Sequence, residues 1–478
     1  MKRLSILVFI FTMAIAAWAV PARKGGIVKI QPDGSQITVY QHGDEHFHWM
    51  TNADGEWLKA DADGFFRVTE ALSAEQIEAK RMATASRAAQ AEVPINIAPR
   101  GLVILVNFTD VAFTTSKAEL DSMLNGYDYS RSYSYKYKMK NYDITSRGSA
   151  RQYFYDSSNG AYNPQFDVVG PVTVSKEMAY YGKNTSGFDA APWTMVKEAC
   201  QLVDLYACGN ELDFRSKKHT GIGTFTHEFS HVLGLPDFYE TTGEGTHKTL
   251  GAWSNLDYGP YNNDGNTPPA LSAYERFMMG WLVPRLIVDP ENVELEDLKI
   301  SNNALLISTI DQHNLIGNNP KPTSFYLLEN RQQMGWDEYL PGHGLMLTKV
   351  QFDSRKWAGN TVNNSPNLMG VDLIEADGKT NTGEDHKSTD LFPAGATKYT
   401  KIADHAIEDI REVDGVIYFK YKGGVENPET AIEDVTAGSN VIAIYNILGQ
   451  KQSTTQIEDL PRGTYVVVTT AGSKKIIL

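Results

Sequence analysis

Two histidines and two acidic residues near the middle of the chain have the spacing of a metal-dependent hydrolytic site. They lie in the segment Gly221-Ile-Gly-Thr-Phe-Thr-His-Glu-Phe-Ser-His-Val-Leu-Gly-Leu-Pro-Asp237. His227 and His231 are four residues apart, so on a helix both imidazoles can reach one tetrahedral ion. Glu228 can then contact a water molecule at the ion instead of the ion itself. The pattern predicts a zinc-hydrolase active site whose fourth position stays open for water.

The same segment predicts the helix that must position these residues. Four apolar residues recur at the spacing of one buried helical face: Phe225, Phe229, Val232 and Leu233. Thr224 follows two glycines and is the expected N-cap. Gly234 is expected to end the helix in the left-handed conformation, so that the chain turns sharply. The turn could bring the Asp237 carboxylate back as a third ligand.

Other interpretations of this segment stay open. A surface helix that carries two histidines by chance would show the same pentapeptide, and Asp237 in Leu-Pro-Asp-Phe-Tyr would also suit a simple turn. The apolar face, the glycine and the aspartate at this spacing together favour the metal site. Tyr258, in a turn-rich stretch further on, is a candidate donor to a developing oxyanion, although a tyrosine there is as often a packing residue.

Composition limits the remaining interpretations. The 478 residues are 42% hydrophobic and 21% charged, which is enough for about three domains with substantial cores. A formal net charge of −14 argues against a nucleic-acid partner. Cys200 and Cys208 are too few for a disulfide framework. A bond between them would require a break in any helix that carried both, and two unpaired thiols are the alternative.

The N-terminal residues 1–19 have the layout of a secretory signal. Lys2 and Arg3 precede an apolar run, and Ala17-Trp-Ala19 forms a small-x-small cleavage site. The mature chain would then begin near Val20, be secreted or attached to the cell surface, and contain no membrane span. An uncleaved membrane anchor is the alternative, although the apolar run is short for one and is interrupted by polar residues.

Residues 20–99 are expected to form a β-like module, a helix-forming run over 72–91 and a proline-bounded linker over 94–99. Four polar residues in the module could cover a metal site, as pro-segments do: Asp44, Glu45, His46 and His48. The alternative is that they are surface residues of a strand pair. We expect residues 20–99 to be a pro-region that keeps an enzyme latent.

Alternating strands and helices surround the metal-binding segment. A near-continuous apolar run from Gly101 predicts a buried first strand, and residues 166–174 predict another. Three further segments have helical patterns: 149–157, 193–205 and 272–281. We therefore expect an α/β (α+β) peptidase domain over 100–282, with a mixed sheet and an active-site helix.

Five stretches together resemble one known family. They are His227-Glu-Phe-Ser-His231-x-x-Gly234-x-x-Asp237, Phe166-Asp-Val-Val-Gly-Pro-Val-Thr, Ala273-Tyr-Glu-Arg-Phe-x-x-Gly-Trp281, Leu327-Leu-Glu-Asn-Arg-Gln and Tyr339-Leu-Pro-Gly-His-Gly344. The chain resembles the immune inhibitor A-like secreted metallopeptidases, of the metzincin type. The resemblance implies zinc bound by His227, His231 and Asp237, Glu228 as general base, and a pro-segment that must be removed.

The chain departs from this family at two places. Metzincins have a methionine in the turn beneath the metal, and the matching position here is Leu256, an apolar residue of similar volume. The link from Leu205 to Gly223 is also shorter than in relatives, which have an edge strand there. An extended peptide adds to such an edge by main-chain hydrogen bonds, so its loss would weaken substrate binding more than zinc binding.

Short apolar runs separated by turn residues predict a β-rich domain over 283–422, followed by a glycine-rich linker. Residues 433–478 contain three strand-like runs and are similar to the C-terminal sorting domains of the type IX secretion system of Bacteroidetes. This similarity implies outer-membrane secretion machinery as a partner. The β-rich domain is expected to support the peptidase or to present substrate.

The sequence thus predicts a secreted zinc endopeptidase that acts on proteins or peptides. Zinc would activate water, and Glu228 would take the proton and return it to the leaving amine. Calcium is retained as a second candidate ion. The alternatives are another zinc amidohydrolase and a non-catalytic surface binding or adhesion protein on a degenerate peptidase scaffold. The presence of Glu228, which is not needed to bind zinc, favours the enzyme.

Overall fold

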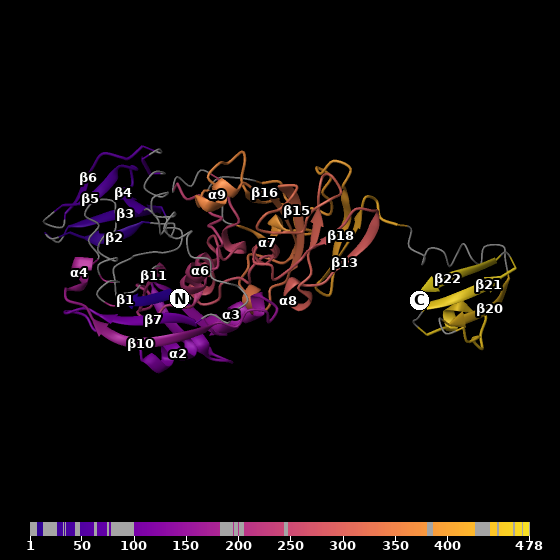
Figure 1. Ribbon diagram of the computed structural model, residues 1–478, viewed down its shortest axis with the longest axis horizontal. Coiled ribbons are helices and arrows are strands. Elements are labelled where there is room, and N and C mark those ends of the chain that lie inside the picture. Colours follow the sequence, from indigo (N-terminus) through magenta and orange to yellow (C-terminus); the bar gives the residue numbers. More distant parts are fainter. Residues whose placement is uncertain are drawn as a thin grey trace, which may run out of the picture. The chain divides into compact units, whose positions relative to one another are not determined.

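The protein is an α+β structure with several sheets and few helices (Figure 1). This computed structural model describes residues 7–12, 26–31, 33, 35–43, 48–61, 65–73, 76–77, 100–181, 195, 199, 205–242, 247–379, 386–425, 440–446, 449–461, 464–470 and 472–477. The chain divides into two compact units. The first unit is Met1–Val288, Leu295–Thr397 and Arg411–Ile417, and the second is Asp289–Glu294, Lys398–Ile410 and Tyr418–Leu478.

A four-stranded sheet packs against the helix that carries His227 and His231. Its order is β10 (Gln165–Thr173), β7 (Arg100–Asn107), β1 (Leu7–Thr12) and β11 (Leu205–Asn210). The strands predicted at Gly101 and at 166–174 are confirmed as β7 and β10. All three described strand pairs of this sheet are parallel, so within the described residues this sheet is not the mixed sheet expected for the peptidase domain.

Strand β7 is buried on both faces of this sheet. Val103 and Leu105 belong to the core cluster that includes the metal-binding helix, whereas Ile104 and Val106 belong to a second cluster. Successive side chains of a strand point to opposite faces, so a strand covered on both faces needs an uninterrupted apolar sequence. The near-continuous apolar run in the sequence therefore reflects this central position.

Helix α6 (Gly223–Val232) carries the two histidines, and α3 (Ala150–Ser157) packs against it. Ser149 caps α3 by accepting a hydrogen bond from the Gln152 backbone N–H, as the predicted helix at 149–157 requires. The cap expected for α6 is wrong. The N-cap is Ile222, which makes no side-chain cap bond, and Thr224 lies inside the helix.

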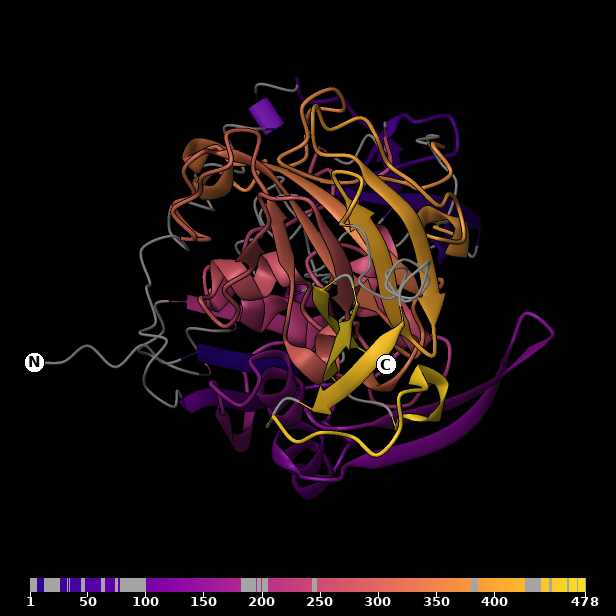
Figure 2. The same cartoon turned by 90° about the vertical axis from the view of Figure 1, so that its right-hand side faces the viewer.

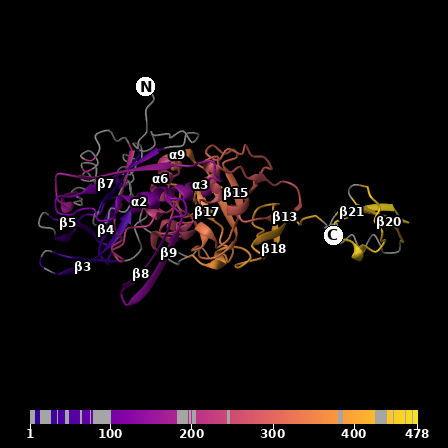
Figure 3. The ribbon, with the colours of Figure 1, turned by 90° about the horizontal axis from the view of Figure 1, so that it is seen from below.

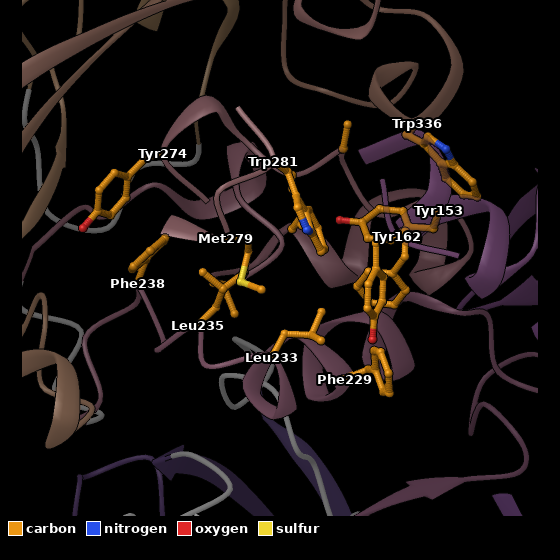
Figure 4. Close-up of a cluster of buried hydrophobic side chains, with 14 of the residues drawn as sticks. Tyr153, Tyr162, Phe229, Leu233, Leu235, Phe238, Tyr274, Met279, Trp281 and Trp336 are labelled. Carbon is orange, nitrogen blue, oxygen red and sulfur yellow. The ribbon is translucent and has the colours of Figure 1, made fainter. Parts of the chain in front are cut away.

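Aromatic packing holds α6 on the sheet. The ring of Phe166, from β10, contacts Phe225 and Phe229 edge-on at centroid distances of 4.7 and 5.1 Å. Figure 4 shows Phe229 and Leu233 in one apolar cluster with Tyr162 and Trp281. This cluster fixes the rotation of α6, because these apolar side chains occupy the face that points into the core.

Strand β1 comes from the segment predicted as a signal. Residues 7–12 pair in parallel with β7 on one side and with β11 on the other. Removal of residues 1–19 would therefore leave β7 and β11 without the strand between them. Cleavage of the signal stays a prediction, and none of the described helices is both long and apolar enough to cross a membrane.

The main core continues beyond residue 282 into a second sheet. Its order is β12 (Arg285–Leu286), β14 (Leu305–Ile307), β15 (Ser324–Arg331), β16 (Gly344–Gln351) and β17 (Val371–Leu373). Leu327, Met346 and Val350 share one core cluster with Phe229 of α6. Helix α7 (Ala273–Met278), with a capping box between Ser272 and Glu275, packs against β15 and confirms the helix predicted after the site.

The remaining described strands form separate small sheets (Figures 2 and 3). Strands β8 (Ser130–Tyr137) and β9 (Lys140–Arg147) form a long hairpin. Strands β13 (Glu291–Leu295), β19 (Val416–Tyr421) and β18 (Ile407–Val413) form one sheet. The predicted C-terminal strands are confirmed as β20 (Val441–Asn446), β21 (Thr464–Thr469) and β22 (Gly472–Ile477).

The N-terminal module is a five-stranded antiparallel sheet. Its strands are β2 (Ile27–Ile30), β3 (Gln36–Gly43), β4 (His48–Thr51), β5 (Trp57–Ala60) and β6 (Phe66–Val68). Of the polar cluster that could cover a metal site, residues 44–46 lie outside the described residues and His48 begins β4. The expected helices at 72–91 and 193–205, the linker at 94–99 and Cys200 also lie wholly or mostly outside them.

Deleting residues 1–19 is expected to destabilise the sheet under α6. β7 and β11 would each lose one hydrogen-bonded neighbour, and each lost bond costs about 0.5–1.5 kcal/mol. Urea unfolding, with amide hydrogen exchange in β7, measures the effect. The matched control lacks residues 1–6 and keeps β1. Equal unfolding midpoints for the two deletions would show that β1 does not stabilise the folded chain.

Candidate metal centre

Three potential ligand atoms converge at the C-terminal end of α6. The Nε2 atoms of His227 and His231 are 3.0 Å apart. Oδ1 of Asp237 lies 3.2 Å from the first and 3.3 Å from the second. Ligands placed 2.0–2.1 Å from a tetrahedral zinc ion are about 3.3–3.4 Å from one another, so the three separations fit such an ion.

The sharp turn that brings Asp237 back depends on Gly234. Its φ is +97°, a left-handed conformation that favours glycine, as the sequence predicts. The Leu235 backbone N–H donates to the Ser230 carbonyl at 3.1 Å, which closes the turn against the last turn of α6. Asp237 therefore lies next to both histidines, and its role as a ligand stays a prediction.

The hydrogen bonds of the two histidines determine what their Nε2 atoms can bind. His227 Nδ1 lies 2.7 Å from the Asn255 carbonyl oxygen, and His231 Nδ1 lies 2.7 Å from the Leu235 carbonyl oxygen. A carbonyl only accepts, so both Nδ1 atoms carry the proton and both neutral rings present a lone pair at Nε2. Two lone pairs and a carboxylate oxygen then face one point, which a divalent cation satisfies.

Burial and charge at Asp237 agree with this interpretation. Its side chain and that of His227 are fully buried, whereas the His231 side chain is 18% exposed. Complete burial works to raise the pKa of Asp237, but the charge and hydrogen bonds that His231 and His227 supply when Nε2 is protonated outweigh burial and hold that pKa well below its usual range. A cation bound at Nε2 would act on Asp237 in the same direction. Asp237 is therefore ionised, and the exposed side of His231 leaves one direction of approach open.

A turn between η1 (Gly251–Trp253) and η2 (Gly259–Gly265) lies beneath the ligands. It supplies the Asn255 carbonyl to His227, and its Leu256 carbonyl accepts the Phe238 backbone N–H at 2.7 Å. Leu256, at the position where the resembling family has methionine, is fully buried. A methionine of similar volume would suit the same space, so the leucine is compatible with the site.

The turn is held from below by a buried carboxylate. The Ser254 hydroxyl donates to Glu275 Oε1 at 2.6 Å and accepts the Leu256 backbone N–H at 3.0 Å. Glu275 lies in the first turn of α7 and is fully buried, and burial raises its pKa. The orientation of His227 thus depends on α7 through the chain of contacts Glu275, Ser254 and the turn.

The two residues predicted to assist chemistry lie on α6 and on the turn that contacts His227. Glu228 follows His227 on α6 and is 5% exposed. Tyr258 ends the turn and is half-buried; burial, followed by the charges of Asp257 and Glu240, raises the pKa of its phenol. Tyr258 therefore stays protonated, as a hydrogen-bond donor must. The roles of both residues stay predictions.

Sequence reasoning missed two neighbours of the ligands. The ring of Tyr239 stacks on His227 at a centroid distance of 6.5 Å. Asn360 donates its amide to Asp237 Oδ2 at 2.5 Å. Tyr239 could have been predicted as a neighbour of the ligands, because it lies two residues after Asp237 in the sequence. Asn360 could not, because it lies 123 residues further along the chain.

Comparison with known proteins agrees with this site. The family described as immune inhibitor A peptidase M6, catalytic domain, matches residues 96–215 and 214–282. The match covers less than half of the chain and includes all three candidate ligands. Its two pieces meet at residues 214–215, inside the link 205–223. The match indicates a peptidase, and with the ligand cluster it indicates a metallopeptidase. No curated protein matched the chain.

Replacing one histidine ligand should remove the metal. His231→Ala leaves two protein ligands, so we expect the zinc content, measured by elemental mass spectrometry, to fall from near one per chain to near zero. His343→Ala is the matched control, since this histidine is 51% exposed and contacts Glu412 instead of the ligands. A His231→Ala protein that retains stoichiometric zinc would place the ion elsewhere.

Proposed function

We propose that the chain is a secreted zinc endopeptidase that hydrolyses peptide bonds in proteins. The observation that carries the proposal is the convergence of His227, His231 and Asp237 on one point, with Glu228 on the same helix. Structural zinc sites use four protein ligands, whereas catalytic sites use three and keep one position for water or substrate. The three-ligand set and the retained Glu228 both favour catalysis over a structural ion.

Each residue has a defined part in the proposed reaction. A bound zinc ion supplies a Lewis acid, which polarises the scissile carbonyl and lowers the pKa of water from about 15.7 toward 7. Glu228 accepts the proton of the attacking water and returns it to the leaving amine. Its burial shields this proton from bulk solvent. Tyr258 donates its phenol O–H to the carbonyl oxygen as negative charge develops there.

A binding or adhesion protein on a metallopeptidase scaffold is the second candidate. The short link 205–223 favours it, because among the described residues β11 is the last strand on that side of the sheet. A substrate that adds to a sheet edge by main-chain hydrogen bonds would meet β11 here instead of the edge strand that the family resemblance implies.

Calcium is not proposed as a bound ion. Among the described residues, only one group of three His, Cys, Asp or Glu side chains has its ligand atoms within 4.8 Å of one another. This group is His227, His231 and Asp237.

We also propose a processing scheme for the chain. Residues 1–19 act as the export signal, 20–99 as a pro-region, 100–282 as the peptidase domain and 283–422 as its β-rich support. Residues 433–478 address the chain to outer-membrane secretion machinery. The order of these segments and the three-stranded C-terminal sheet support the scheme.

Glu228→Ala should separate metal binding from catalysis. General acid–base catalysis contributes about 10²–10⁴-fold, so we expect turnover of a peptide substrate to fall by at least that range while zinc content stays near one per chain. Glu177→Ala, at an exposed glutamate, is the control and should keep full activity. If the wild-type chain binds zinc but cleaves neither peptides nor denatured protein after removal of residues 20–99, the binding-protein candidate is correct.

Processing should raise activity. We expect a chain that starts near Arg100 to cleave peptides faster than one that starts at Val20, because the pro-region no longer blocks the site. Steady-state kinetics on both chains measures the difference, and equal rates would exclude latency.

Truncation at Gly424 should prevent secretion, because it removes the proposed sorting segment. Fractionation of the native host measures this. A truncated chain that still reaches the surface or medium normally would show that residues 433–478 have no sorting role.

A further inference from the structure

The third ligand is held by a residue far outside the metal-binding motif. Asn360 donates its side-chain amide to Asp237 Oδ2 at 2.5 Å, and its amide oxygen accepts the Asp237 backbone N–H at 2.7 Å. Both residues are buried, with 0% and 5% of Asp237 and Asn360 exposed. The two bonds form a reciprocal pair, so one asparagine fixes both the backbone and the carboxylate of Asp237.

This pair determines which carboxylate oxygen faces the histidines. A backbone N–H only donates, so the Asn360 oxygen must face it and the Asn360 nitrogen must face Oδ2. Rotation of the Asp237 carboxylate would break the charge-assisted bond to Oδ2. Oδ1 is therefore left toward His227 and His231, at 3.2 and 3.3 Å.

Two more asparagines of the same segment hold the chain that follows Asp237. Asn363 donates to the Phe238 carbonyl at 2.7 Å. Asn364 accepts from the backbone N–H and the hydroxyl of Thr241 at 2.9 and 2.8 Å. The segment 360–364 thus lies along the whole ligand loop 237–241 and replaces contacts that a strand or helix would otherwise supply.

The position of Asn360 depends on the helix before it. Helix α9 (Ser354–Ala358) ends at Gly359, and Asn360 follows with a φ of +53°. Asparagine is one of the few residues other than glycine that enter this left-handed region readily. It is therefore a residue that can both end α9 in this way and offer an amide to Asp237.

Aromatic packing ties α9 to the ligand loop. Trp357 contacts Tyr274 edge-on at 6.3 Å, and Tyr274 contacts Phe238 at 5.9 Å. Phe238 follows Asp237 directly. Asn360 and Asp237 are thus joined both by hydrogen bonds and by a row of rings that passes through α7.

We infer that Asn360 is a positioning residue for the metal centre, and that the unit that binds the metal extends to the segment 360–364, beyond the residues matched by the peptidase family. The inference rests on the proposed metal site but not on peptidase activity. Residues that orient a metal ligand typically contribute 10–100-fold to metal affinity. A residue that only stabilises the fold as a whole would not change affinity in the folded protein, and one that only orders the loop 237–241 would change it no more than Asn364 does.

Zinc affinity tests this inference. Competition with a chromogenic chelator, on the full chain without bound metal, compares Asn360→Ala, Asn360→Asp and Asn364→Ala with the wild type. We expect Asn360→Ala to bind zinc 10–100-fold more weakly. Asn360→Asp is nearly isosteric and keeps the acceptor, but it places a second carboxylate against Asp237, so its affinity should fall at least as far.

Asn364→Ala is the matched control, because it loosens the same loop at Thr241 without touching Asp237. Its affinity should stay within about threefold of wild type. The visible spectrum of the cobalt-substituted protein should change in both Asn360 variants and not in the control, because it reports the ligand geometry. Circular dichroism and thermal unfolding of the metal-free proteins show which variants fold.

Two results would overturn the inference. One is a folded Asn360→Asp or Asn360→Ala protein with wild-type zinc affinity and cobalt spectrum. The other is an equal loss of affinity in Asn360→Ala and Asn364→Ala, which would show a general role in loop folding. If the wild-type chain itself binds no zinc, the proposed metal centre is wrong. This outcome can be told apart from failure of the Asn360 inference, because it is measured on the wild-type chain alone.

Discussion

When both histidines are neutral, three hydrogen-bond acceptors are held together at the metal centre. The Nδ1 atoms of His227 and His231 are committed to carbonyl oxygens, so their Nε2 lone pairs and the Asp237 carboxylate face one another at 3.0–3.3 Å. Such an arrangement is unfavourable without a cation or a proton, because negative charge and lone pairs face one another in a buried site. The surrounding structure has to hold these groups in place against their mutual repulsion. The turn beneath His227, the left-handed Gly234 and the amide of Asn360 all serve this constraint.

The parts of the site that depend on local spacing could be predicted from the sequence. The i, i+4 histidines, the glycine that ends the helix and the serine cap of α3 each involve residues within one or two turns of one another. The start of α6 was not predicted correctly, because it depends on contacts with a distant loop. A Cβ on Gly223 would lie 2.0 Å from the Pro260 carbonyl oxygen, and one on Gly221 would lie 2.1 Å from that of Gly265. These glycines allow close packing of η2, and Thr224 is left inside the helix.

Long-range pairs were beyond sequence reasoning for the same reason. Asn360 carries no motif of its own, and a lone asparagine 123 residues after Asp237 has no periodicity that would mark it. The core is similarly continuous across residue 282, where the sequence suggests a change of domain. Arg331 of β15 is fully buried, donates to Asp337 at 2.7 and 2.8 Å and bonds the Ala270 carbonyl just before α7. The β-rich region therefore helps to hold α7, which in turn supports the turn beneath His227.

The sheet that packs against α6 sets a second constraint, which bears on the proposed removal of residues 1–19. Adjacent strands lie about 4.8 Å apart, so β7 and β11 are separated by roughly twice that distance and only β1 connects them. The short link 205–223 contains β11 and leads directly to α6, which leaves little chain to form another strand there. A chain that loses residues 1–19 must either move β11 against β7 or leave two rows of backbone groups unpaired. Because β11 leads into α6, movement of β11 would also shift the helix that carries both histidines. The proposed removal of residues 1–19 would therefore be physically coupled to the geometry of the candidate metal centre.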